Sequence, residues 1–171
     1  FQPADGLRPT GDRIRETAFN WLTASIDGAR CIDLFAGSGA LSFEALSRGA
    51  SHCTCIEQQG TAVKQLRENA ALLQAEGLDI VHTDSLKYLQ QGAPPQPYNL
   101  AFIDPPFAAG LVSKTCALLN NDSWLTAKAM IYCEMAATDN SFIAPENWQM
   151  LREKVSGEVR YCLYSRIEPK L

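Results

Sequence analysis

The four residues Asp104-Pro105-Pro106-Phe107, which follow the apolar run 98–103, combine an acid, two prolines and an aromatic ring. Proline fixes φ at about −65° and has no backbone N–H, so the turn is stiff and its carbonyls are free to accept hydrogen bonds from a ligand. Asp104 adds a charged acceptor, and Phe107 adds a face on which a flat ring can stack. The pattern favours a clamp for a planar ring that bears an amino group. An ordinary strand-ending turn is the alternative, because Asp and Pro are common turn residues.

A second chemical signal is the turn Gly37-Ser38-Gly39, which follows the apolar segment 31–35. Glycines let the backbone approach a ligand closely at the N-terminus of a helix. The spacing is close to the dinucleotide fingerprint G-x-G-x-x-G, with Glu57 about 20 residues further on to hold a ribose. The third glycine is missing, however, because position 42 is Ser. A ligand with a ribose and an adenine but no pyrophosphate therefore fits better.

Acidic residues stand at the ends of four successive predicted strands: Asp33, Glu57, Asp84 and Asp104. In an open α/β sheet, ligands bind beyond the carboxyl ends of the strands, so we expect these four acids to meet in one crevice. Helix capping is an equal alternative for Asp84 alone.

S-adenosylmethionine matches this arrangement. Its carboxylate can meet the amides of 37–39, its positive charges are tolerated near Asp33, and Glu57 can accept both ribose hydroxyls. Asp84 can accept from the adenine amino group while the amide of Ser85 donates to a ring nitrogen. The predicted cofactor site consists of Asp33, Phe35, Ala36, Gly37, Ser38, Gly39, Glu57, Asp84 and Ser85.

Strand-like and helical patterns alternate along most of the chain, which is typical of a mostly parallel sheet with helices on both faces. A helix is expected from Thr10 or Asp12 to about residue 26, with an apolar stripe along it. The expected strands are 31–35, 53–57, 78–82, 98–104 and 129–134, and the expected later helices are 40–48, 61–75, 85–90 and 109–120. Segments 149–155 and 159–164 flank Ser156-Gly157-Glu158, which predicts a hairpin. The sequence thus predicts one α/β domain over 1–171: an arm and helix over 1–29, and over 30–171 a Rossmann-like core with a seven-stranded, mostly parallel sheet ending in an antiparallel hairpin.

Composition limits the possible functions. A chain of 171 residues with 46% hydrophobic and 20% charged residues is typical of a soluble globular domain, and it has no apolar run of the roughly 20 residues that span a membrane. A formal net charge of −4 argues against a protein that coats naked nucleic acid. The positive charge gathers at the chain ends, so RNA contacts are expected there. The six cysteines form no C-x-x-C pair, which favours reduced core thiols in a cytoplasmic protein and no metal site.

Together, the segments 33–39 and 104–107 and the acid Glu57 resemble the cofactor and amine-site motifs of amino-group methyltransferases. The block Leu7-Arg8-Pro9-Thr10 with residues 13–22 resembles the opening of the bacterial 16S rRNA guanine-N2 methyltransferases of the RsmD type. Gly110-Leu111, Trp124-Leu125 and the segments 152–157 and 163–166 are similar to the later pattern of that family. The resemblance covers nearly the whole chain, and its N-terminal block is more specific than D-P-P-F, which DNA amino-methylases share.

The resemblance implies a class I methyltransferase fold and transfer of a methyl group from S-adenosylmethionine to the exocyclic N2 of one guanine in 16S rRNA. It implies a monomer that acts on the small-subunit particle without a metal. It also implies catalysis by Asp104, Pro105, Pro106 and Phe107, and RNA contacts by Arg8, Thr10, Arg13 and Arg15. Because a methylated amine is strongly acidic, no shifted pKa is expected for Asp104. A DNA amino-methylase and a non-catalytic RNA-binding module are the alternatives, and an NAD-dependent oxidoreductase would need the missing third glycine.

Overall fold

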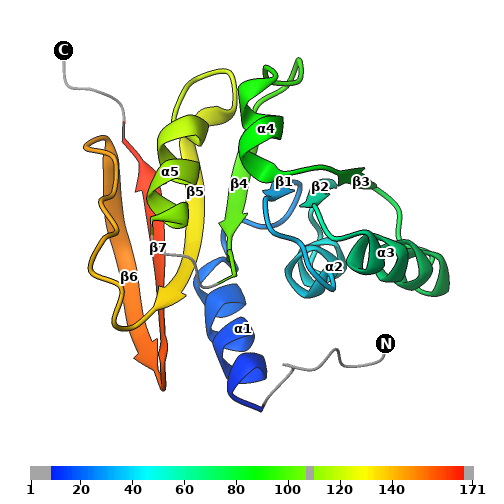
Figure 1. Ribbon diagram of the computed structural model, residues 1–171, viewed down its shortest axis with the longest axis horizontal. Coiled ribbons are helices and arrows are strands. Elements are labelled where there is room, and N and C mark those ends of the chain that lie inside the picture. The colour runs from blue at the N-terminus through cyan, green and yellow to red at the C-terminus, as the bar shows by residue number, and fades with distance from the viewer. Residues whose placement is uncertain (1–8, 107–109, 168–171) are drawn as a thin grey trace.

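The computed structural model describes residues 9–106 and 110–167, which form one seven-stranded sheet flanked by helices (Figure 1). The elements in chain order are α1 Pro9–Trp21, β1 Arg30–Asp33, α2 Ala40–Ser47, β2 His52–Glu57, α3 Gly60–Leu72, β3 Leu78–His82, α4 Ser85–Gln90, β4 Tyr98–Ile103, α5 Leu111–Leu119, β5 Leu125–Ala136, β6 Trp148–Ser156 and β7 Val159–Arg166.

The strands lie in the order β3-β2-β1-β4-β5-β7-β6. Strands β1 to β5 pair in parallel, whereas β7 pairs antiparallel with both β5 and β6. The strands β1, β2 and β3 follow one another towards one edge of the sheet, and β4 then lies on the other side of β1. At such a change of direction, between β1 and β4, an open α/β sheet leaves a crevice beyond the carboxyl ends of its strands. The predicted Rossmann-like sheet with an antiparallel C-terminal hairpin is confirmed.

Two apolar layers cover the sheet. On one face, α4 and α5 pack side chains such as Val112 and Leu119 against Ile103 and Ile131. On the other face, α1, α2 and α3 pack Phe19, Leu22 and Leu66 against Phe102 and Tyr132. All six cysteines are buried with free thiols, as predicted.

The first helix is shorter than predicted. It ends at Trp21 rather than near residue 26, because the Thr23 hydroxyl donates to the carbonyls of Phe19 and Asn20 and the backbone then turns. The apolar stripe remains buried as far as Ile26, so its inward-facing side chains were predicted correctly even though the end of the helix was not.

Strand β5 is longer than predicted. It begins at Leu125 instead of Ala129, because Leu125 already pairs with Tyr98 before a bulge shifts the register to Leu100 and Met130. Its carboxyl end beside β4 is the part that reaches the candidate site.

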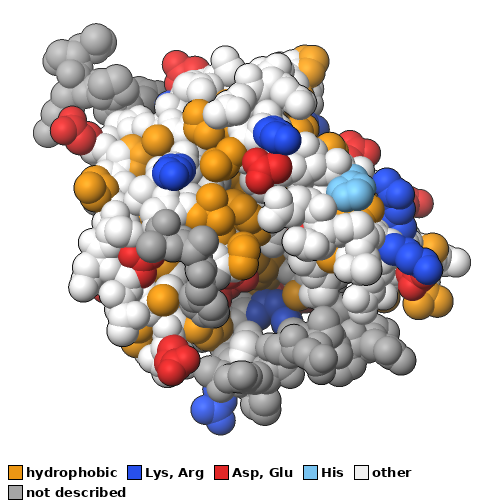
Figure 2. Space-filling view, in the orientation of Figure 1, with side chains coloured by type: hydrophobic (Ala, Val, Ile, Leu, Met, Phe, Trp, Pro, Cys, Tyr) orange, Lys and Arg blue, Asp and Glu red, His pale blue; other side chains and the backbone are white. Residues whose placement is uncertain are grey.

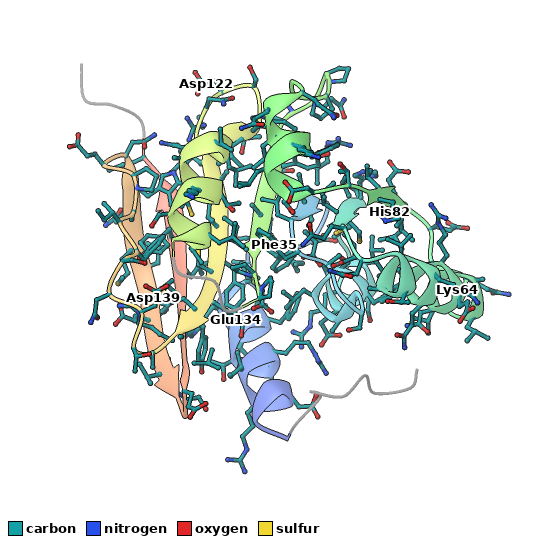
Figure 3. All side chains as sticks on the ribbon, in the orientation of Figure 1. Phe35, Lys64, His82, Asp122, Glu134 and Asp139 are labelled. Carbon is teal, nitrogen blue, oxygen red and sulfur yellow. The ribbon has the colours of Figure 1, made fainter. Side chains whose placement is uncertain are left out.

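The surface is hollowed on the side shown in Figure 2, beneath a stripe of apolar side chains. In the same orientation, Lys64 and His82 project from the outer edge at α3 and β3, whereas Phe35 and Glu134 lie near the centre (Figure 3). Among the described residues, no helix has the length and apolar character needed to cross a membrane.

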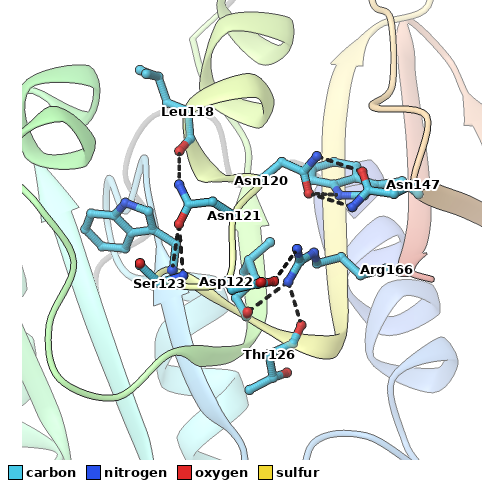
Figure 4. A network of polar contacts seen from close by, with 11 residues as sticks. Leu118, Asn120, Asn121, Asp122, Ser123, Thr126, Asn147 and Arg166 are labelled. Atoms are coloured by element: carbon cyan, nitrogen blue, oxygen red, sulfur yellow. Dashed lines mark hydrogen bonds and ion pairs between the residues drawn. The ribbon is translucent and has the colours of Figure 1, made fainter. Parts of the chain in front are cut away.

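A polar network ties the last strand to the loop that precedes β5 (Figure 4). Arg166 is 9% exposed and donates to the carbonyls of Leu125 and Thr126 at 2.9 and 3.1 Å, and to the Asp122 carboxylate at 3.0 Å. Beside it, the side-chain oxygen of Asn120 accepts from the Trp148 indole N–H at 2.9 Å.

Replacing Arg166 with Met should lower the free energy of unfolding by about 3 kcal/mol, because two buried carbonyls lose their donor. The matched variant Asp122→Ala should leave it almost unchanged, since the Asp122 side chain is 96% exposed. Urea unfolding of the cofactor-free protein measures both. If both variants lowered the free energy of unfolding equally, the stabilising contact of Arg166 would be its ion pair with Asp122 and not its hydrogen bonds to the two carbonyls.

Candidate active site

A cavity of about 1080 Å³ opens at the carboxyl ends of the parallel strands. The predicted cofactor residues on its wall are Phe35, Ala36, Gly37, Ser38, Glu57, Asp84 and Ser85, with Asp104 and Pro106 at one end. Asp33 and Gly39 lie beneath this wall and are buried. The structure therefore brings the predicted cofactor residues together around one space, as the strand-end argument requires.

The glycine turn holds Glu57 in place. Gly37 donates its N–H to one carboxylate oxygen of Glu57 at 2.9 Å, and Gln59 donates to the other at 2.8 Å. Gly37 and Gly39 have φ values of +54° and +85°, a region that residues with a Cβ rarely adopt. Each carboxylate oxygen keeps a second lone pair, so Glu57 is fixed in position and can still accept from a ribose diol.

Asp33 lies directly under the turn with 1% of its surface exposed. Ser42 donates to one of its oxygens at 2.6 Å, and the other oxygen has no hydrogen-bond partner among the described residues. Burial raises the pKa of Asp33 to about 7, the Ser42 hydroxyl opposes this rise, and the negative charges of Asp104 and Glu57 add to it. Ser42 occupies the place of the missing third glycine, and in this chain it supports the acid.

Asp84 caps α4. Its carboxylate accepts from the backbone N–H of Lys87 at 3.1 Å, and the Ser85 hydroxyl donates to the carbonyl of Leu34. The capping alternative for Asp84 is therefore confirmed, and both residues also line the cavity. That Asp84 and Ser85 also bind adenine remains a prediction.

Asp104 lies beside Glu134, a residue that the sequence analysis did not select. Ile103 pairs with Cys133 as the last pair of the parallel β4–β5 ladder, so the residues that follow them, Asp104 and Glu134, are neighbours, although β5 itself continues to Ala136. Burial, the negative charge of Glu134 and a hydrogen bond to Glu134 raise the pKa of Asp104 well above its usual value. Burial also raises the pKa of Glu134, while the neighbouring polar groups of Asp104 and Tyr132 oppose that rise. The expectation of an unshifted pKa for Asp104 is wrong, because burial and the neighbouring charge of Glu134 both disfavour the ionised form of Asp104.

A second cavity, of about 420 Å³, adjoins the first. Pro106 and Glu134 line both cavities, Pro105 lines the second, and its far wall comes from the end of β5 and residues 138–141. The turn that follows β4 therefore stands where the two spaces meet. Phe107, predicted to stack on a base, lies outside the described residues.

The comparisons agree with this geometry. The family model described as "Conserved hypothetical protein 95" matches residues 1–165. "Ribosomal RNA small subunit methyltransferase D" of Escherichia coli (strain K12) is 46% identical over 161 residues, which cover 94% of this chain and 80% of that protein. The chain belongs to this methyltransferase family.

Solved structures give the same result for the fold. The solved structure of the putative methyltransferase yhhF from Escherichia coli has a TM-score of 0.89 and is 45% identical in sequence. The match covers 98% of this chain and 91% of the yhhF chain. Magnesium protoporphyrin IX methyltransferase (ChlM) from Synechocystis PCC 6803, solved with bound SAM, has a TM-score of 0.70 at 16% identity, with coverage of 92% and 80%. At that identity the likeness concerns the fold alone. The predicted class I methyltransferase fold and the predicted resemblance to the RsmD-type family are both confirmed.

The four residues predicted to contact RNA differ in where they lie relative to the large cavity. Arg15 lines the large cavity and pairs with Asp12 at 2.9 Å rather than with Glu16. Arg13 is exposed and is absent from the cavity wall. Thr10 lies within α1, and Arg8 falls outside the described residues.

The tip of the β6–β7 hairpin also reaches the large cavity, through residues 156–159. The sequence analysis used this turn only as a hairpin signal, because nothing in its local pattern shows where the hairpin folds. Within 9–106 and 110–167, no group of three or more His, Cys, Asp or Glu residues has the geometry to hold a metal ion.

Proposed function

We propose that this member of the family transfers a methyl group from S-adenosylmethionine to the exocyclic N2 amine of one guanine in the 16S rRNA of the small ribosomal subunit. The observation that carries the proposal is the place of the turn 104–106, between a cofactor-sized cavity and a second one that Glu134 also lines. The relative named a ribosomal RNA small subunit methyltransferase supports the class of substrate.

The residues fit S-adenosylmethionine. The unpartnered buried oxygen of Asp33 is an acceptor that lacks a donor, as expected beneath an ammonium group. Glu57 is fixed to accept the ribose hydroxyls, and the open backbone at Gly37 leaves room for a carboxylate at the start of α2. Asp84 and Ser85 stand further along the same wall for the adenine. When bound, the cofactor supplies an electrophilic methyl group on a positively charged sulfur.

The chain's own residues then position the amine. The lone pair of a guanine N2 is delocalised into the ring, so the free amine is a poor nucleophile. Hydrogen bonds from N2 to the Asp104 carboxylate and the Pro105 carbonyl turn the lone pair towards the methyl group, and positioning of this kind can supply several kcal/mol. Asp104 also stabilises the positive charge that grows on nitrogen. Once methylated, N2 would be acidic, and its proton would pass to the Asp104–Glu134 pair.

The RNA is expected to arrive in a protein-bound state. The formal net charge of −4 allows few phosphates to be neutralised, which makes bare RNA a poor high-affinity partner. Arg15 at the cavity rim and the exposed Arg13 supply positive charge near the entrance. We therefore place the reaction on a small-subunit particle in the cytoplasm, with the protein acting as a monomer.

The test combines binding and product mapping. Isothermal titration should show S-adenosylmethionine binding to the purified protein, and incubation with unmethylated small subunits should yield N2-methylguanine at one 16S rRNA nucleotide. Bare 16S rRNA and duplex DNA serve as comparison substrates. Methyl transfer to DNA adenine or cytosine, or cofactor binding without any transfer to subunits, would overturn the proposal.

A further inference from the structure

We propose that Glu134 selects guanine by accepting a hydrogen bond from its N1–H inside the second cavity, next to the N2 amine held by Asp104. This inference rests on the proposed function and adds to it the side chain that distinguishes guanine from other purines. The second cavity is thereby assigned as the base pocket.

The position of Glu134 carries the argument. It comes one residue after the Ile103–Cys133 pair, the last pair between β4 and β5, so it lies beside Asp104, the residue that follows Ile103. Figure 3 shows Glu134 near the centre of the molecule. Neighbouring strands lie about 4.8 Å apart. The N1 and N2 donors of guanine are adjacent on one edge of the ring, so carboxylates on two adjacent strands can each accept from one of them. Glu134 lines both cavities, whereas Asp104 faces the cofactor cavity.

The second cavity suits a flat base. Its volume of about 420 Å³ lies within the usual range for small-ligand pockets, about 300–1,000 Å³. Pro105, Pro106 and Val112 give it apolar surface, which favours the faces of a ring. The polar edge of the base would then meet Glu134, because Asp139, the other half-buried acid on the wall, already accepts from the backbone N–H of Ser141 at 2.9 Å.

The far wall is held from two sides. Arg160 on β7 donates to the carbonyl of Asp139 at 3.0 Å. From α5, the Ser113 hydroxyl donates to the carbonyl of Ser141 at 3.3 Å and accepts from the backbone N–H of Ile143 at 3.1 Å. A pocket fixed in this way can reject a base of the wrong shape or polarity, because its walls do not relax to fit.

The group behind Glu134 supports an accepting role. The Tyr132 hydroxyl is fully buried and makes no hydrogen bond of normal geometry with the described residues. It lies on the same face of β5 as Glu134, where a small movement lets it donate and stabilise the ionised carboxylate. An ionised Glu134 only accepts. It attracts the N1–H of guanine and repels the N1 lone pair that adenine and 2-aminopurine present.

The experiment uses 2-aminopurine, which keeps the N2 amine but has an acceptor at N1. After the methylated nucleotide has been mapped, 16S rRNA with guanine or 2-aminopurine at that position is assembled into small-subunit particles. Wild-type protein should methylate guanine about 10- to 100-fold faster, the range expected for leaving a buried polar group unpaired. Glu134→Gln should narrow this ratio to within about threefold, because an amide can accept from N1–H or donate to a bare N1.

The control variant is Glu153→Gln on the exposed edge strand β6, which should keep the wild-type ratio. Unchanged cofactor affinity and an unchanged melting temperature should show that Glu134→Gln is folded. Equal loss on both bases, or a wild-type enzyme that accepts 2-aminopurine as well as guanine, would overturn the inference and leave the proposed function standing. Absence of N2-methylguanine on natural particles would instead overturn the proposed function, and the inference with it.

Discussion

Asp104→Asn should slow methyl transfer to small subunits by about a thousandfold while leaving the affinity for S-adenosylmethionine nearly unchanged. The asparagine keeps the shape of the side chain but loses the charge that stabilises the amine nitrogen as it becomes positive. Charge stabilisation of a transition state by one group is commonly worth about 10²–10³ in rate. The amide keeps one accepting oxygen, so most of the loss comes from the missing charge. Single-turnover transfer and calorimetric titration of the cofactor measure the two properties separately.

The same residue gives the reaction a pH dependence. Burial and the neighbouring charge of Glu134 hold the pKa of Asp104 above its usual value, so Asp104 loses its proton later as the pH rises. The single-turnover rate of the wild type should therefore rise with pH, with a midpoint above about 4, the ordinary range for an aspartate. In Glu134→Gln the neighbouring negative charge is gone, and the midpoint should move to lower pH.

The control for Asp104→Asn is Asp122→Asn, which changes an exposed acid far from both cavities. It should match the wild type in rate and in cofactor binding. If Asp104→Asn retained more than about a tenth of the wild-type rate, Asp104 would have no catalytic role and the turn would act through Pro105 alone.

Local patterns in the sequence predicted much of this site. The ends of β1 at Asp33, of β2 at Glu57 and of β4 just before Asp104 depend on residues that are close together in the chain, as does the turn at Gly37. Such signals need no knowledge of the neighbouring strands. For this reason the order of elements agrees with the prediction, and most of the residues predicted to bind the cofactor line one cavity.

Glu134 was missed because its role depends on the sheet order. The sequence analysis placed a strand end at Glu134, but nothing local shows that β5 lies beside β4, which brings the two acids together. The rule that acids at strand ends converge, applied to the fifth strand as well, would have selected it. The same limit explains the hairpin tip, whose place at the cavity follows from β7 inserting next to β5.

Ser42 shows a different limit. In the sequence it counts as the absence of a glycine, which disfavours a pyrophosphate ligand. Its positive role, the 2.6 Å hydrogen bond to Asp33, depends on how α2 packs over β1. The thiols of Cys53 and Cys55 lie within 3.2 and 3.0 Å of the same hydroxyl, so a buried polar cluster supports the acid from below.

Gly39→Ala should lower the free energy of unfolding of the cofactor-free protein by about 2–5 kcal/mol. A Cβ at Gly39 would stand 2.5 Å from the Leu66 side chain and 2.7 Å from that of Phe43, and the residue has φ of +85°. Left-handed backbone costs an L-residue about 1–2 kcal/mol, and forcing an extra methyl group into a packed core costs about 1–3 kcal/mol more. The loss arises because α3 and α2 would have to move apart at the start of the turn.

Gly37→Ala is the matched control, since its φ of +54° carries similar strain but a Cβ there meets nothing within 4 Å. It should lose only about 1–2 kcal/mol, the cost of the strain alone. Its new methyl group would instead stand in the cofactor cavity, because Gly37 is part of the wall. Urea unfolding should therefore rank Gly39→Ala as the less stable variant. At a temperature where both are folded, calorimetry should rank Gly37→Ala as the weaker binder of S-adenosylmethionine. If one variant were worse in both measurements, the two glycines would not have the separate roles of packing and ligand access that the geometry gives them.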